Sequence, residues 1–194
     1  EYTLAAGSMG PPMIVPNDRC REIINAFRMK NDPYPKLWKK MEEFLIRMVM
    51  CSPSELKVLK TTKENSILLP NGLYLDYPGL KGDYDQVNER YSNFKYYSLE
   101  EQQNPDAKGR KIYGGLLTEN VVQALARIIV ADQMLAISKE LRVVTMTHDE
   151  VVCVVPENEV DDAKQFMLDE MRIAPSWCID LPLNAEAESG ERYG

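Results

Sequence analysis

Hydrophobic residues recur every three or four positions in four stretches of the chain, and this spacing predicts four amphipathic helices. Asn17 or Asp18 is expected to cap the first helix and Thr118 the third, because short polar side chains accept hydrogen bonds from the free amides of a first helical turn. Pro33 ends the first helix, since a proline pushes the preceding residue out of the α region. The predicted helices span about residues 17–31, 34–50, 118–140 and 158–173.

Shorter hydrophobic runs between these helices predict strands. Ser66–Leu69 and Leu73–Tyr77 flank the turn Pro70-Asn71-Gly72, which is the pattern of a β-hairpin. Pro78–Arg90 is rich in turn residues and is predicted to be an exposed insertion. Further strands are expected at 93–99, 110–113 and 183–188. The order of the elements favours an α+β fold, in which helices pack on a small, largely antiparallel sheet.

One strand pair surrounds the single histidine of the chain. The segments 143–147 and 151–155 are rich in valine and other β-formers, and they flank the polar triplet His148-Asp149-Glu150. The two segments are too apolar for an exposed sheet edge. We therefore predict a buried hairpin that presents three polar side chains at its tight turn.

The composition is that of an ordinary globular protein. The 194 residues are 44% hydrophobic and 27% charged, which fits about one domain and excludes collagen, coiled coil and wholesale disorder. A single histidine excludes a multi-histidine metal site. The four cysteines have no zinc-binding spacing, so we expect reduced thiols. The longest apolar run, residues 124–131, is interrupted by Arg127 and is too short to cross a membrane.

Charge is distributed unevenly along the chain. The net charge is −7, from 23 Lys and Arg against 30 Asp and Glu. Residues 149–194 hold twelve of these acids and three of the bases, so this end carries −9, while residues 1–148 carry +2. A negative chain is not the usual footprint of a nucleic-acid binder. Because the acidity is concentrated at one end, the average charge is weak evidence about the ligand.

The His148-Asp149-Glu150 turn is the strongest candidate for a chemical site. Asp149 offers the hard oxygen ligands that Mg²⁺ prefers, and Mg²⁺ often binds through one or two carboxylates plus substrate phosphates. A two-metal site for phosphoryl transfer needs a further carboxylate from another segment. Asp76 and Asp83 lie in or beside a loop that is predicted to be exposed. Aspartate also occurs in hairpin turns for conformational reasons alone, and the residues leave both interpretations open.

A second polar feature lies on the third predicted helix. Glu119, Gln123 and Arg127 are four residues apart and form one polar stripe. Such a stripe is usually no more than the solvated side of an amphipathic helix.

Four segments, taken in order, carry a family resemblance. They are residues 69–75 (LPNGLYL), 113–127 (YGGLLTENVVQALAR), 147–152 (THDEVV) and 181–191 (LPLNAEAESGE). They resemble the hairpin after the fingers, the helix before the third palm motif, that motif itself and the closing palm strand of the family A (DNA polymerase I-like) DNA polymerases. The helix segment, residues 113–127, has the form seen in phage-type members. Four motifs in the correct order are far more specific than any one of them.

The resemblance implies a right-hand polymerase with an α+β fold. The palm would be a small antiparallel sheet packed by helices, accompanied by part of the helical fingers. Residues 1–50 would form the rear of the fingers, residues 51–117 a hairpin and insertion leading into the palm, and residues 118–194 the palm with its catalytic hairpin.

The resemblance also implies roles for single residues. Asp149 would be a catalytic ligand of two Mg²⁺ ions, with Glu150 as its supporting neighbour, and His148 would contact the primer terminus. The helix would contact the template–primer DNA through Glu119, Asn120, Gln123 and Arg127. The implied reaction transfers a nucleotide from a dNTP to a primer 3′-hydroxyl. Its expected place is the cytoplasm of a bacterial or phage-infected host cell, with no membrane involved.

The chain also departs from the family pattern. It lacks the first palm motif, which supplies the other essential Asp, and the fingers Arg and Lys that hold the triphosphate, so we expect a fragment that is inactive alone. Gly7-Ser8 stand where the family usually has Tyr-Gly, and Tyr2–Gly10 is given no nucleotide-binding role. Two alternatives stay open. One is a single-subunit RNA polymerase relative, in which Ser tends to stand at the position of Glu150, and the other is a non-catalytic remnant that binds DNA or a protein.

Overall fold

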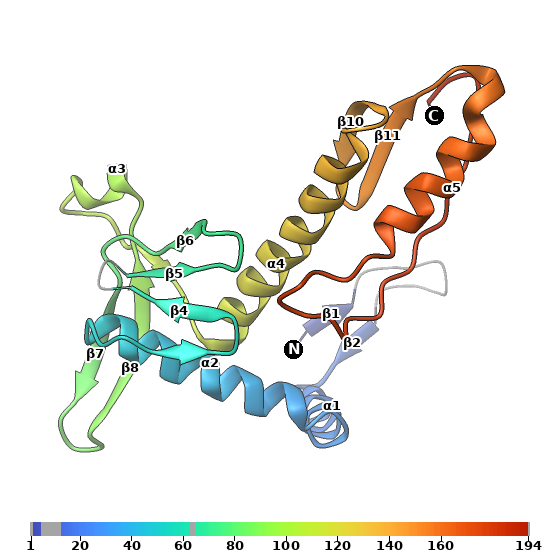
Figure 1. Ribbon diagram of the computed structural model, residues 1–194. Helices are drawn as coiled ribbons and strands as arrows, with labels where there is room; N and C mark the ends of the chain where they lie inside the picture. Colours follow the sequence, from blue (N-terminus) through green and yellow to red (C-terminus); the bar gives the residue numbers. More distant parts are fainter. Residues whose placement is uncertain (1, 5–12, 63–64, 194) are drawn as a thin grey trace.

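The computed structural model describes residues 2–4, 13–62 and 65–193. A long helix, α4 (Gly114–Ile137), runs through the middle of a mixed α+β structure with small antiparallel sheets (Figure 1). One group of elements gathers at the start of α4 and another at its end. Gly7 and Ser8 fall outside the described residues, whereas β1 (Tyr2–Leu4) pairs with β2 (Met13–Val15).

The first helix stands apart from the core. α1 spans Asn17–Lys30 and follows Pro16, which occupies the N-cap position, so the prediction of a cap at Asn17 or Asp18 is wrong. A proline immediately before the helix leaves no side-chain oxygen to accept from the first amides. The predicted helical stripe is present, but it is about half exposed, and α1 has no buried residue.

The second helix provides one wall of the core. α2 spans Pro33–Val49 and begins with a proline, whose missing N–H costs nothing in the first turn. Four residues at helical spacing are buried, as the pattern predicts, and they are Met41, Phe44, Leu45 and Met48. The opposite face of α2 is cationic and exposed.

A four-stranded antiparallel meander packs beside α2. Its strands, in order, are β3 (Glu55–Leu56), β4 (Leu59–Thr61), β5 (Ser66–Leu68) and β6 (Tyr74–Asp76). The predicted hairpin is confirmed as β5–β6, and Gly72 at its turn has φ +83°, a conformation that favours glycine.

A three-stranded sheet follows. Its elements are β7 (Lys81–Asp85), β8 (Arg90–Tyr96) and β9 (Arg110–Lys111), with the short helix α3 (Leu99–Gln102) between the last two strands. The prediction of an exposed insertion at 78–90 is therefore wrong for its central part, because β7 pairs with β8. Gly82 of β7 lets the backbone of this strand approach the buried ring of Phe94 closely, since a Cβ at position 82 would lie 2.9 Å from that ring.

Helix α4 begins four residues earlier than predicted. Tyr113 is its N-cap, and Thr118 lies inside the helix, where its Oγ1 donates to the carbonyl of Gly114 at 2.7 Å. The prediction of a cap at Thr118 is wrong because the start of α4 is fixed by packing against α2. A Cβ on Gly114 would lie 1.9 Å from the carbonyl oxygen of Trp38.

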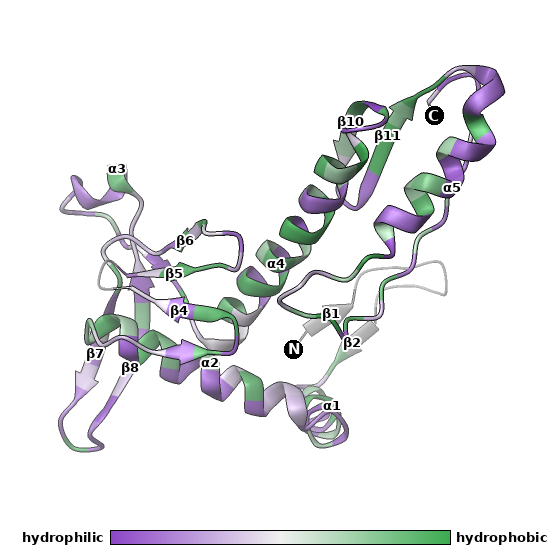
Figure 2. Cartoon of the chain, in the orientation of Figure 1, coloured by the Kyte–Doolittle hydropathy of each residue, from purple (hydrophilic) through white to green (hydrophobic). Residues whose placement is uncertain are grey.

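The core is one continuous cluster, which extends from α2 across both sheets to the middle of α4. Its fully buried members include Leu45, Met48, Ile67 and Leu117, while Phe94 and Ile112 anchor the three-stranded sheet. Figure 2 shows hydrophobic stretches on both α2 and α4, and the two helices contact each other near the start of α4.

Helix α4 is also unusually apolar. Its 24 residues have a window of mean hydropathy 1.4, and by length and composition it could cross a membrane, contrary to the prediction from residues 124–131. Within the structure 22% of that window is buried. The core helices of soluble proteins satisfy the same two criteria, so this property does not establish a membrane helix.

The second group of elements lies along the far half of α4. A predicted hairpin is confirmed as β10 (Arg142–Thr147) and β11 (Glu150–Val154). Its predicted burial is wrong, since Val144 and Val154 are 47% and 56% exposed. The two strands form a sheet of their own, and among the described residues no third strand joins it, so much of its surface stays uncovered.

The chain then returns past the hairpin. The short helix η1 (Glu157–Glu159) leads into α5 (Val160–Met171), which packs along α4 and corresponds to the fourth predicted helix. The predicted strand at 183–188 is wrong, because the structure assigns no regular element to these residues. Arg172 holds this stretch instead, donating to Asn184 Oδ1 at 3.3 Å and to the carbonyl of Ala185 at 3.2 Å.

Candidate active site

The tip of the β10–β11 hairpin is a two-residue turn. Thr147 pairs with Glu150, which leaves His148 and Asp149 as the loop residues. His148 has φ +53°, in the left-handed region that tight hairpin turns require at their first position. The strand pair thus fixes the backbone on both sides of the triplet, and all three side chains are exposed. The sequence-based prediction of three polar side chains at a tight turn is confirmed.

Two of the three tip residues have no protein partner. Across residues 2–4, 13–62 and 65–193, no hydrogen bond or ion pair engages the side chain of His148 or Asp149. Glu150 differs, because its Oε2 accepts a hydrogen bond from the hydroxyl of Tyr193 at 2.9 Å. This hydrogen bond and the negative charge of Glu150 raise the pKa of Tyr193. The carboxylate of Asp149 is therefore free to bind a ligand, while that of Glu150 is held.

The tip carries two carboxylates, of which only that of Asp149 lacks a protein partner among the described residues. Mg²⁺ commonly takes one or two carboxylate ligands beside water and phosphate oxygens. Within the described part of the chain, no three His, Cys, Asp or Glu residues come close enough to form a metal cluster. Asp76 and Asp83 belong to the elements at the other end of α4 (Figure 1). The residues present fit a carboxylate ligand but not a complete cage.

The polar stripe of α4 is exposed over its whole length. Glu119, Gln123 and Arg127 are all open to solvent, and Gln123 Nε2 donates to Glu119 Oε1 at 3.4 Å. A ligand lying along α4 would meet these three side chains in sequence.

The side chain of Asn120 links α4 to the rest of the fold. Its Nδ2 donates to the hydroxyl of Tyr77 at 3.0 Å, which ties α4 to the loop after β6. Tyr77 is only 2% exposed, and its burial raises the pKa of the phenol to about 12. The amide of Asn120 is thus turned toward the core, away from the direction in which Gln123 and Glu119 are exposed.

The hairpin that carries the tip packs against α4, the helix that carries the polar stripe. After α4 ends at Ile137, β10 runs back along the helix and contacts it (Figure 1). The strand pair therefore lies along the second half of α4 (Figure 1).

The sequence did not identify the polar residue that joins α4 to α5. Gln133 is 7% exposed, and its Nε2 donates to the carbonyl of Met171 at 2.7 Å, which satisfies one of the free carbonyls at the end of α5. The sequence did contain one indication that Gln133 is buried: it lies four residues from both Ile129 and Ile137, on the same apolar face of the helix.

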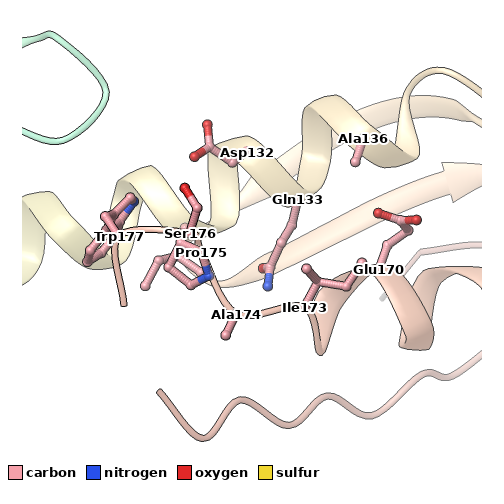
Figure 3. A pocket seen from close by; sticks show the side chains of 10 residues that line it. Asp132, Gln133, Ala136, Glu170, Ile173, Ala174, Pro175, Ser176 and Trp177 are labelled. Carbon is pink, nitrogen blue, oxygen red and sulfur yellow. The ribbon is translucent and has the colours of Figure 1, made fainter. Parts of the chain in front are cut away.

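Beside this hydrogen bond lies a shallow pocket. It has a volume of about 160 Å³ and is lined by α4 and the segment after α5 (Figure 3). Asp132 and Glu170 stand on its rim and Trp177 closes one end, as Figure 3 shows. Its lining carries no basic group, so it offers no positive charge to a phosphate.

The four cysteines are free thiols, as predicted. Cys51 is exposed, whereas Cys20, Cys153 and Cys178 are half-buried. Burial raises the pKa of the Cys153 thiol, which keeps it protonated beside the hairpin. None of them takes part in the candidate site.

Comparison with known proteins adds a relative. No protein-family model matches the chain, and no solved structure matches it. The chain is 32% identical over 181 residues to the DNA polymerase of Bacillus phage SP02, an alignment that covers 89% of this chain and 27% of that protein. The chain therefore spans about a quarter of the length of this relative, and the similarity extends over most of the structure described above.

Proposed function

We propose that the chain is part of a DNA polymerase, which extends a primer by transferring nucleotides from dNTPs under the direction of a template. The similarity to a phage DNA polymerase over 89% of the chain supports this proposal. The observation that carries it is the hairpin tip, where a rigid turn presents His148 and Asp149 with no competing protein partner.

We further propose that the enzyme is a family A polymerase of the phage type. The elements along the second half of α4 would form the palm, and α1 with α2 would form the rear of the fingers. In support, the four resembling segments follow one another in the family's order along the chain, and three of them coincide with the β5–β6 hairpin, the first half of α4 and the β10–β11 tip. In the closing segment, Asn184 accepts a hydrogen bond from Arg172. Just after this segment, Tyr193 donates a hydrogen bond to Glu150 of the hairpin.

Asp149 is the proposed ligand of the catalytic Mg²⁺ pair. When bound, the two ions would activate the primer hydroxyl and neutralise the charge that develops on the phosphates. A further carboxylate has to come from outside the described residues, because these hold no cluster of three ligands. For this reason we expect the 194-residue chain alone to be inactive.

The chain's own residues would mainly position the substrate. Glu150, held by Tyr193, would keep the turn in register so that Asp149 faces the primer end. His148 would contact the primer terminus, and the stripe on α4 would follow the template–primer DNA through Gln123 and Arg127. Holding reactants in the right geometry accounts for much of the rate enhancement in phosphoryl transfer.

Primer extension with two nucleotide pools tests the proposed function. The protein that carries this chain is incubated with a primed DNA template and either dNTPs or NTPs. We expect extension with dNTPs. Preferred incorporation of ribonucleotides would indicate the RNA polymerase alternative. Binding of DNA with no incorporation of either nucleotide would indicate the non-catalytic remnant.

A further inference from the structure

The register of the β7–β8–β9 sheet places three lysines side by side. Lys81 pairs with Lys95, and Lys95 pairs with Lys111 on the next strand. Residues directly opposite one another in an antiparallel pair project from the same face, with their Cβ atoms about 4.5–5.5 Å apart. Gly82 faces the buried ring of Phe94, so the neighbouring lysines occupy the outer face of the sheet.

No member of this lysine row (Lys81, Lys95 and Lys111) has an ion-pair partner among the described residues. Asp83, two residues along β7, accepts a hydrogen bond from Asn93. Like charges that lie directly opposite one another destabilise a sheet. The row is therefore a concentrated positive site that favours binding an external anion.

An aromatic ring is fixed at one end of the lysine row. Lys81 Nζ lies 5.6 Å from the centroid of the Tyr97 ring. Two glycines with positive φ flank that ring, and a Cβ would lie 3.5 Å from it at Gly79 and 2.7 Å from it at Gly109. The Tyr97 ring thus occupies a space between Gly79 and Gly109 that a side chain at either position would take up. Proteins that bind single-stranded nucleic acid combine cationic side chains with aromatic rings in this way.

We propose that the lysine row binds the phosphodiester backbone of DNA, an assignment of ligand that rests on the proposed polymerase function. The row is about 10 Å long, and a DNA strand carries one charge per about 3.4 Å of axis, so the row spans about three phosphates. Lys111 lies three residues before α4 begins, and Arg127 is about 20 Å further along that helix. The row therefore contacts DNA away from the reacting end.

Salt-dependent DNA binding tests the proposal. The protein is changed at all three positions to Lys81→Gln, Lys95→Gln and Lys111→Gln, and the affinity for a primed duplex is measured by fluorescence anisotropy between 50 and 200 mM salt. Each lost phosphate contact lowers the slope of log K against log salt by about 0.9. We expect the slope to fall by about 2 to 3 and the affinity at low salt to fall at least about tenfold.

A control with the same change in charge separates contact from net charge. Lys39→Gln, Lys40→Gln and Lys139→Gln remove three exposed lysines that lie outside the sheet. We expect the slope of this control to stay within about 1 of the wild type. Equal slopes for the control and the row variant would overturn the proposal.

Two further measurements keep the test decisive. If the triple variant unfolds, Lys95→Gln alone should lower the slope by about 1, because Lys95 is the middle member of the row. The same slope in Lys95→Gln as in the wild type would contradict the proposal. DNA binding is read without nucleotides, so failure of the row is separate from failure of the polymerase activity. Absent primer extension by the protein that carries this chain, alongside a row-dependent salt slope, would overturn the polymerase assignment and leave the row as a DNA-binding site.

Discussion

The hydroxyl of Tyr193 donates a hydrogen bond to Glu150 Oε2 at 2.9 Å, joining two residues that are 43 positions apart. Glu150 directly follows Asp149 at the hairpin tip, so the last residues of the described chain reach the candidate active site. The contact fixes the second strand of the hairpin from outside its own sheet. It leaves the carboxylate of Asp149 without a protein partner.

Removing this hydrogen bond should loosen the C-terminal segment. In Tyr193→Phe, we expect a glutamate-specific protease to cut the largely exposed stretch 186–191 about two- to tenfold faster, because one exposed hydrogen bond to a charged group is lost. Limited proteolysis followed by mass spectrometry measures this. Tyr34→Phe, at an exposed position of α2, is the control and should leave the cleavage rate unchanged. Equal cleavage rates in both variants would show that the hydrogen bond does not hold the tail.

The buried phenol of Tyr77 should make the fold sensitive to alkaline pH. Burial raises its pKa from 10.0 to about 12 in the folded state, while the unfolded chain ionises at the ordinary value. The resulting stability is complete below pH 10 and is lost as the pH rises toward 12. In a titration followed at 295 nm, we expect one tyrosine to ionise near pH 12. Tyr77→Phe should remove this late step and Tyr34→Phe should not.

The link between Gln133 and the carbonyl of Met171 should contribute measurably to stability. In Gln133→Leu, side-chain volume is retained but the half-buried carbonyl of Met171 loses its donor, which costs about 1–3 kcal/mol. Urea denaturation measures the change in the free energy of unfolding. Gln165→Leu is the matched control, because Gln165 is exposed on α5 and should change stability by less than about 0.5 kcal/mol. A loss in the control as large as in Gln133→Leu would argue against the contact.

The crossing of α2 and α4 should tolerate no side chain at Gly114. A Cβ there would lie 1.9 Å from the carbonyl oxygen of Trp38, so Gly114→Ala must push the two helices apart. We expect a loss of about 3 kcal/mol or more in the free energy of unfolding. Thermal unfolding followed by circular dichroism is the measurement. Gly190→Ala, in the exposed tail, should have little effect, and similar melting temperatures for the two variants would refute the close approach.

The sequence predicts an element well where its buried residues recur at the regular spacing of a helix or of a strand. α2 is such a case, because Met41, Leu45 and Met48 keep the helical spacing and are all buried. The start of α4 could not be predicted, since it depends on the contact between Gly114 and Trp38, which only the tertiary structure brings together. Locally, Thr118 was the best candidate for the N-cap of this helix, but the tertiary contact between Gly114 and Trp38 determined where the helix begins.

The candidate site was predicted in part for similar reasons. Turn chemistry placed His148 and Asp149 at the tip correctly, because this is a local property of the two strands. The hydrophobicity of Val144 and Val154 predicted burial, but burial needs a neighbouring layer that the described residues do not supply. The partner of Glu150 was missed because the path of the tail depends on contacts such as those of Arg172.

The most direct test of the proposed function is single-turnover primer extension by Asp149→Asn in the protein that carries this chain. Loss of an essential charge-stabilising ligand should lower the rate of nucleotide incorporation by at least about 10²- to 10³-fold, with the fold intact by circular dichroism. Asp180→Asn, which changes an exposed carboxylate elsewhere in the acidic end, should incorporate nucleotides at the wild-type rate. Incorporation by Asp149→Asn within about threefold of Asp180→Asn would contradict the assignment of the hairpin tip as the catalytic site.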